Sequence, residues 1–185
     1  LRVHPASGFG GKAFVTLSGY QADVEAAIPA TAIIHFQLSD TSTPLQLDFR
    51  ESSDKLHTVS VNGESSGWYW ENEHLVMPAD ALRVGRNVVN IGFEAGSSSL
   101  NRNPEYLYTL FVPDRARTAF PLFDQPDLKA TFMLTLILPQ GWTAMSNGAT
   151  QAVEAVGPRR VVRFERSNLI PSYLFSFVAG KFEEV

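Results

Sequence analysis

The 185-residue sequence contains no cysteine, and this absence removes several kinds of site at once. Without thiols the chain can form no disulfide, no Cys-ligated metal site and no thiolate nucleophile. Histidine is also scarce, and the four that are present (His4, His35, His57 and His74) include no pair four positions apart, as an H-E-x-x-H zinc motif requires. We therefore expect no metal site and no catalytic residue in these 185 residues.

Long apolar runs and blocks of like charge are also missing. The longest largely apolar run, residues 132–139, is far shorter than the roughly 20 residues that cross a bilayer, so no membrane span is expected. The 15 Lys and Arg residues are scattered and 19 acidic residues give a net charge of −4, which speaks against a nucleic-acid partner. The opening "LRVHPASGFGG" lacks the apolar core of a signal peptide. The compartment stays open, with a lean toward a periplasmic or secreted protein from the absent cysteine and the Trp- and Tyr-rich strands.

Helical periodicity is nearly absent, and the best helical turn is residues 78–82. Instead, apolar residues recur at every second position, as in residues 45–49, where leucines and a phenylalanine alternate with Gln46 and Asp48. This period of two places one face of each strand on a core and predicts an all-β fold, a large antiparallel β-sandwich. The expected strands are 13–17, 20–26, 31–38, 45–49, 56–62, 67–71, 74–77, 89–94, 106–112, 130–138, 142–146, 151–155, 160–166 and 173–182.

The chain is short enough to form a single β-domain over residues 1–185. We divide it into a first sheet region at 1–94, a loop at 95–105 and a motif-bearing region at 106–185. The loop "AGSSSLNRNPE" is the most polar, turn-rich stretch of the chain. Residues 1–19 match no pattern, and their role stays open.

Two short stretches invite a functional interpretation. Residues 63–67 spell G-x-S-x-G, but Asn62 and Gly63 favour a hairpin turn, and strand-like residues follow where a nucleophile elbow needs a helix. Trp68 and Trp70 share one face of a strand. The two indoles either belong to the core or form an exposed platform for a carbohydrate or peptide ligand, and the sequence leaves both alternatives open.

The stretch "RTAFPLFDQPDLKATFML", residues 117–134, packs prolines, phenylalanines and aspartates tightly together before a strand. The prolines fix φ and interrupt regular structure, while the phenylalanines can anchor the turn to a core. Arg117 and Asp124 carry opposite charges and could pair across the turn, bonding backbone groups left without partners. The residues expected to form this structural knot are Arg117, Phe120, Pro121, Phe123, Asp124 and Pro126.

This region resembles the N-terminal domain of the aminopeptidase N family, the zinc metallopeptidases with the gluzincin fold. The family pattern there is similar to Y-x-Y-T-x-x-E-P-x-x-A-R-x-x-F-P-C-F-D-x-P-x-x-K-A-x-F. Further on, residues 144–148 resemble the family's Ser-Asn turn, and "IPSYLFSFVAGKFEEV" resembles the segment that closes the domain. The strong match covers residues 106–182. The matching positions of the central motif are Tyr106, Tyr108, Thr109, Pro113, Ala116, Arg117, Phe120, Pro121, Phe123, Asp124, Pro126, Lys129, Ala130 and Phe132.

The resemblance implies a saddle-like β-sandwich that is not catalytic by itself, because the family's G-A-M-E-N and H-E-x-x-H motifs are absent from these residues. It implies as partners a C-terminal catalytic domain in the same chain and a peptide substrate. No cofactor is expected here, whereas zinc is expected in the catalytic domain, bound by two histidines and a glutamate, with a second glutamate as general base.

Two positions depart from the family pattern. Where the family often carries Gln or Glu reaching into the active site, this sequence has Leu110 and Val112. Neither side chain can accept a hydrogen bond from a substrate ammonium group. The resemblance thus predicts that Leu110 and Val112 form an apolar wall of the substrate site. The alternative is that both belong to a strand core.

Overall fold

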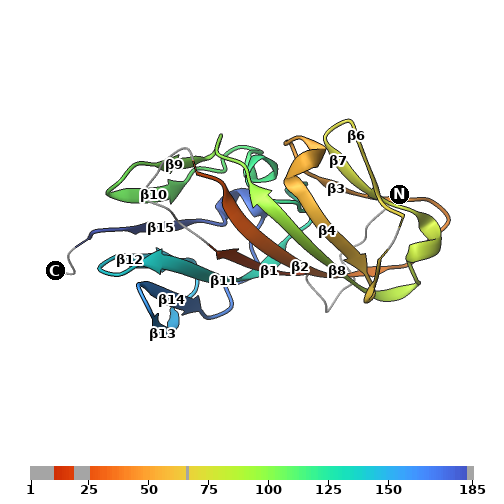
Figure 1. The fold of residues 1–185 in the computed structure, drawn as a ribbon. Coiled ribbons are helices and arrows are strands. Elements are labelled where there is room, and N and C mark those ends of the chain that lie inside the picture. Colours follow the sequence, from red (N-terminus) through yellow and green to blue (C-terminus); the bar gives the residue numbers. More distant parts are fainter. Residues whose placement is uncertain (1–10, 19–25, 66, 183–185) are drawn as a thin grey trace.

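The computed structural model describes residues 11–18, 26–65 and 67–182 and confirms an all-β fold of antiparallel sheets (Figure 1). The largest sheet has eight strands, the second has four and the third has three. In Figure 1 the four-stranded sheet lies at the left end of the large sheet, and the three-stranded sheet lies at the upper right. Buried residues from all three sheets form one hydrophobic core, as a β-sandwich requires.

The eight-stranded sheet has the order β13 (Thr150–Val156), β14 (Arg159–Phe164), β11 (Ala130–Pro139), β1 (Gly11–Ser18), β2 (Ile28–Leu38), β8 (Gly85–Ala95), β4 (Leu56–Val61) and β5 (Glu64–Ser65). Its longest strands follow the predicted period of two, since β2 buries every second side chain along its length. One pair differs from the prediction: β1 and β11 run parallel, which two strands far apart in the sequence can do because no hairpin joins them.

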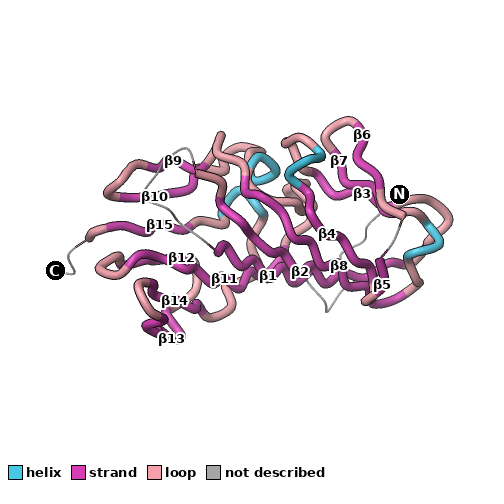
Figure 2. The backbone as a smooth tube through the Cα atoms, in the orientation of Figure 1, coloured by secondary structure: helices cyan, strands magenta, loops and turns pink. Residues whose placement is uncertain are grey.

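The four-stranded sheet has the order β12 (Thr143–Ser146), β15 (Phe177–Gly180), β10 (Tyr106–Thr109) and β9 (Leu100–Arg102). The three-stranded sheet has the order β3 (Leu45–Asp48), β7 (His74–Met77) and β6 (Tyr69–Glu71). Four single turns of 3-10 helix lie in the connections, η1 (Ser53–Lys55), η2 (Ala79–Ala81), η3 (Ala116–Thr118) and η4 (Ser172–Leu174), and appear in cyan in Figure 2.

Several boundaries differ from the sequence prediction. The predicted loop at 95–105 contains a short strand, β9, which pairs with β10. The strand expected at 106–112 ends at Thr109, and the one expected at 173–182 begins only at Phe177 because η4 precedes it. The strand expected at 20–26 falls almost wholly outside the described residues. Three-residue strands carry too little periodicity to be recognised in sequence.

A cluster of phenylalanines joins the sheets where the four-stranded sheet meets β11. The Phe175 ring stacks on Phe132 of β11, with 4.4 Å between ring centroids, and touches Phe111, Phe120 and Phe177 at centroid distances of 5.8–6.3 Å. All five side chains are buried. These residues come from four separate stretches of chain, so the cluster fixes those stretches relative to one another.

We expect Phe175→Ala to lower the free energy of unfolding by about 3–5 kcal/mol, because it removes the ring at the centre of the cluster. Urea denaturation would measure the loss. The matched control is Leu174→Ala, since the neighbouring Leu174 is exposed and its truncation should cost far less. Equal losses for the two variants would show that the cluster is not centred on Phe175.

Candidate functional site

Residues 106–112 form a ridge of exposed apolar side chains, and the ridge comprises Tyr106, Tyr108, Leu110 and Val112. The residues between them, Leu107, Thr109 and Phe111, are buried. Leu110 is 51% exposed and Val112 is 53% exposed. Neither side chain therefore belongs to the strand core, and that alternative is wrong.

Buried contacts decide which residues of this segment face outward. The Thr109 hydroxyl accepts a hydrogen bond from the Phe177 amide at 3.1 Å, and the Leu110 amide donates to the Ser99 carbonyl at 3.1 Å. Phe111 lies in the phenylalanine cluster. With Thr109 and Phe111 held inward, the alternation of an extended chain directs Leu110 outward between them.

The ridge continues across the four-stranded sheet onto neighbouring strands. Tyr108 of β10 lies opposite Val178 of β15, which in turn lies opposite Met145 of β12. Gly180 follows Val178 on the same face, and a Cβ added there would lie 2.9 Å from the ring of Phe182, so this ring covers the glycine. We call this surface the outer face. It consists of Tyr106, Tyr108, Leu110, Val112, Met145, Val178 and Phe182.

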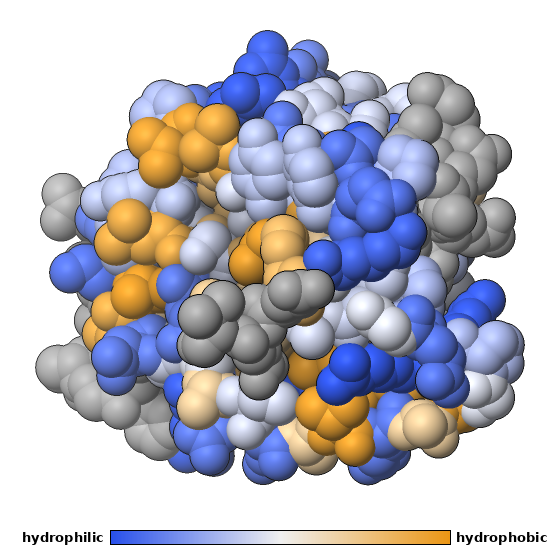
Figure 3. All heavy atoms as spheres, turned by 90° about the vertical axis from the view of Figure 1, so that its left-hand side faces the viewer, coloured by the Kyte–Doolittle hydropathy of each residue, from blue (hydrophilic) through white to orange (hydrophobic). Residues whose placement is uncertain are grey.

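None of the outer-face side chains carries a charge. Figure 3 looks onto the end of the molecule that holds the four-stranded sheet and shows apolar side chains mainly on the left half of that end, with others near its centre and lower right. The acidic residues that flank the ridge in sequence are already paired, Glu105 with Lys181 at 2.9 Å and Asp114 with Arg117 at 2.8 Å. The outer face therefore offers apolar contact and no free ionic group of its own.

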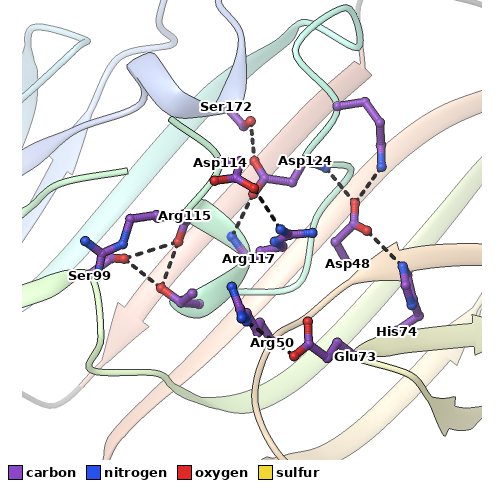
Figure 4. Close-up of polar contacts among 12 residues, drawn as sticks. Asp48, Arg50, Glu73, His74, Ser99, Asp114, Arg115, Arg117, Asp124 and Ser172 are labelled. Carbon is purple, nitrogen blue, oxygen red and sulfur yellow. Dashed lines mark hydrogen bonds and ion pairs between the residues drawn. The ribbon is translucent and has the colours of Figure 1, made fainter. Parts of the chain in front are cut away.

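A network of polar groups centred on Asp48 and Asp124 holds the knot together (Figure 4). Asp48 accepts hydrogen bonds from the Asp124 amide at 2.9 Å and from the Gln125 side chain at 2.8 Å, and its other oxygen lies 3.1 Å from His74 Nε2. The Asp48 amide also donates to the Leu122 carbonyl. Asp48 thus ties the three-stranded sheet to the knot, although its alternation with apolar neighbours predicted a residue on the opposite, non-core side.

The predicted pair of Arg117 and Asp124 takes a different form in the structure (Figure 4). Asp124 accepts a hydrogen bond from the backbone amide of Arg117 at 3.1 Å and another from the Ser172 hydroxyl at 2.5 Å. The Arg117 guanidinium pairs instead with Asp114. Asp124 therefore acts as a cap for backbone and hydroxyl donors, linking η3 to η4. Burial raises the pKa of Asp124 above its ordinary value, and the two hydrogen bonds offset part of that effect.

The remaining predicted knot residues occupy the surroundings of this network. Phe120 is buried in the phenylalanine cluster, and Phe123 packs edge-on against Phe36 of β2 at a centroid distance of 5.5 Å. Pro121 is buried, whereas Pro126 lies exposed in the turn before β11. Sequence reasoning missed Tyr106, Tyr108, Met145 and Val178 as surface residues, although the alternation in "YLYTLFV" carries the signal.

The two tryptophans do not form an exposed platform. Trp68 and Trp70 are both partly buried and pack against the hydrophobic core, while Tyr69 between them is exposed. The structure favours the core interpretation for both indoles.

Other candidate chemistry is also accounted for. Asn62 and Gly63 have positive φ values of 54° and 90°, as a hairpin turn between β4 and β5 requires, so the G-x-S-x-G match lies in a turn. His57 lies 3.5 Å from Glu94, and His74 contacts Asp48. In the part of the chain that the structure describes, no three His, Asp or Glu side chains are grouped closely enough to hold a metal ion. Nor does that part contain a helix with the length and apolar character needed to cross a membrane.

Comparison with known proteins bears on the same region. The family model of the peptidase M1 N-terminal domain matches residues 92–174, which include the ridge and the knot. The chain is 33% identical to aminopeptidase N of Streptomyces lividans over 143 residues, or 70% of this chain and 16% of that protein. It is 36% identical to aminopeptidase M1 of Arabidopsis thaliana over 128 residues, which make up 62% of this chain and 15% of that protein. It is 35% identical to tricorn protease-interacting factor F2 of Thermoplasma volcanium over 85 residues, which make up 46% of this chain and 11% of that protein. The chain thus spans about a sixth or less of the length of these relatives.

Asp124→Asn should destabilise the fold by about 1–3 kcal/mol, because an amide NH₂ group replaces one carboxylate oxygen. That NH₂ group then faces a hydrogen-bond donor, either the Arg117 amide or the Ser172 hydroxyl. Since the folded-state pKa of Asp124 is raised, the stability that the carboxyl contributes is fully present below its unfolded pKa, about 4, and is lost as the pH rises through the folded pKa. The difference in the free energy of unfolding between the parent chain and Asp124→Asn should therefore be largest in acid and become smaller toward neutral pH.

Urea denaturation at several pH values would measure this difference. Asp114→Asn is the control, because Asp114 is exposed and its pair with Arg117 should contribute little at any pH. A difference that widens as the pH rises would contradict the raised pKa of Asp124.

Proposed function

The chain is an N-terminal domain of the aminopeptidase N family, and from this premise we propose that it is the non-catalytic front part of a zinc-dependent aminopeptidase. Two of the relatives described above are named as aminopeptidases and are several times longer than this chain. In this proposal the zinc ion and the groups that activate water belong to a catalytic domain elsewhere in the parent protein.

Within the parent protein the domain has two tasks in this proposal. It packs on the catalytic domain, and it forms one wall of the site that receives the peptide substrate. Leu110 and Val112 form that wall. The observation that carries the assignment is their exposure: both side chains project from a segment that buried Thr109 and Phe111 hold in place.

The chemistry of the wall follows from these two side chains. Leu110 and Val112 can exclude water and contact an apolar part of the substrate, but they offer no acceptor to its α-ammonium group. Recognition of the free amino terminus then falls to the catalytic domain. A wall held by buried neighbours keeps its shape when substrate binds, so it can position the substrate without an ordering cost.

The test uses the full-length parent protein with Val112→Glu. A carboxylate at this position would pair with the substrate ammonium, and we expect KM for aminoacyl substrates to fall by about three- to tenfold at unchanged kcat. Steady-state kinetics with a leucyl and an alanyl substrate would measure the change. Val84→Glu is the control, because Val84 is highly exposed but lies outside the outer face, and its KM should stay unchanged.

An unchanged KM for Val112→Glu would argue against the placement of Val112 in the wall. Absence of aminopeptidase activity and of bound zinc in the full-length protein would overturn the proposed function itself.

A further inference from the structure

We propose that strand β13 is an association edge at which two copies of the protein pair, β13 against β13 in antiparallel orientation, so that their eight-stranded sheets become continuous. β13 is the last strand at one end of that sheet and is bonded to β14 on one side only. In Figure 1 it lies at the lower left margin of the molecule, below β14. This inference goes beyond the proposed function and does not depend on it, because it concerns a different sheet from the outer face.

β13 is the longest sheet edge in the part of the chain that the structure describes. It has seven residues, whereas the other five edge strands, β5, β12, β9, β3 and β6, have two to four. All residues of β13 are exposed except Ala152, which is partly buried. An antiparallel edge strand directs the backbone N–H and C=O groups of alternate residues away from its one neighbour. β13 therefore presents backbone groups that a further strand can bond.

The usual protections of an edge strand are weak in β13. Natural edges avoid pairing through proline, inward-pointing charges or bulges. β13 contains no proline, and its one charged side chain, Glu154, is already paired with Arg163 of β14 at 2.6 Å. Its irregularity lies at its beginning, between Thr150 and Ala152, so the ladder from Ala152 to Val156 is regular. The regular part of the edge thus carries no unpaired charge that would repel a second strand.

Contacts at both ends of the β13–β14 hairpin hold the edge in its extended shape. At the turn, the Gln140 side chain donates a hydrogen bond to the Gly157 carbonyl at 2.9 Å. At the opposite end, the Glu165 amide donates to the Ala149 carbonyl at 2.8 Å. A strand that is already ordered loses little conformational entropy when it pairs, so the hairpin is prepared for association.

The sequence of β13 is compatible with pairing to itself, and this identifies the occupant of the edge as a second copy of the chain. In an antiparallel pair with two-fold symmetry, one residue lies opposite its own copy. With Val153 in that place, Glu154 lies opposite the partner's Ala152, so no like charges face each other directly. With Glu154 in that place, two carboxylates would be opposed.

Val153 also lies on the side of the strand that favours this register. It pairs with Val162 of β14, which is buried, so Val153 faces the core side of the sheet although it is 46% exposed. Two opposed Val153 side chains would cover each other and extend the core across the junction. β-Branched pairs of this kind stabilise antiparallel strands.

The first test is disulfide trapping in the full-length protein, and it uses the absence of cysteine from these 185 residues. Directly opposed residues of antiparallel strands have Cα atoms about 4.5–5.5 Å apart, which a disulfide can bridge. Val153→Cys should therefore give a disulfide-linked dimer on mild oxidation. Val156→Cys is the matched control on the same strand. Val156 is more exposed, at 56%, but the two copies of residue 156 would lie about 20 Å apart.

Mass spectrometry of the non-reduced digest identifies the linked peptides. We expect at least about tenfold more linkage between two copies of residue 153 than between two copies of residue 156, because disulfide formation requires close approach. Equal yields from the two variants would indicate random collision and overturn the proposal, as would a higher yield at position 156. Absence of linkage at both positions would overturn it too, whether the edge is free or is covered by a peptide or another part of the parent chain.

The second test measures association without a cross-link, by sedimentation equilibrium of the full-length protein. A single pair of short strands buries less than the roughly 1,200 Å² of a stable specific interface, so we expect a Kd on the order of 10–100 µM. Val153→Lys would place two ammonium groups opposite each other and should raise the Kd at least about tenfold.

Val84→Lys is the control for the added charge, since Val84 is 67% exposed and does not lie on β13. Its Kd should match that of the unmodified protein. An unchanged Kd for Val153→Lys would contradict pairing through β13, and so would an unmodified protein that stays monomeric at every concentration.

Discussion

The aromatic contacts of Phe175 are the constraint on which the rest of the described architecture depends. This ring brings together β11, the knot, the segment after β10 and β15, whose phenylalanines are spread over residues 111–177. Because Phe111 is one of its partners, the cluster also determines the orientation of the residues on either side of Phe111. The position of an exposed apolar surface is thus decided by buried contacts several residues away, so the core and the surface cannot change independently.

Asp48 supplies the polar counterpart of this constraint. A buried carboxylate is costly unless hydrogen bonds surround it, and Asp48 accepts hydrogen bonds from the Asp124 amide and the Gln125 side chain and lies 3.1 Å from His74 Nε2. These groups come from the knot and from β7, so the requirement to satisfy one carboxylate joins the two regions. The knot is therefore held from both sides, by aromatic packing through Phe120 and by hydrogen bonds through Asp48 and Asp124.

The sequence predicted the features that depend on near neighbours. The period of two identified the long strands β2, β8 and β11, and Asn62-Gly63 identified a hairpin turn, because both signals are local. Features that depend on distant residues were not predictable in the same way. Asp48 alternates like a solvent-facing residue, and only the approach of Gln125 and the Asp124 amide from the knot explains its burial. Likewise, nothing near Arg117 in sequence shows that Asp124 would bond its amide while Asp114 takes its guanidinium.

The same limit applies to the candidate site. The resemblance drew attention to Leu110 and Val112, but whether they face outward depends on the inward packing of Phe111 against Phe120 and Phe175. A shift of this segment by one residue in register would turn the exposed wall into a buried strand face. The surrounding outer face required strand pairing to be known, since Met145, Val178 and Tyr108 meet only because β15 lies between β12 and β10.

The central position of β15 has a consequence for how the protein is made. During synthesis the ribosome releases β10 and β12 well before β15, and until then neither strand has its neighbour on that side. A nascent chain that has reached residue 170 would therefore expose two unpaired strand edges and a phenylalanine cluster without its central ring. The four-stranded sheet can close only after about ten more residues emerge from the exit tunnel. Translation speed over the codons that follow residue 180 would then determine how long those edges remain available to chaperones or to other nascent chains.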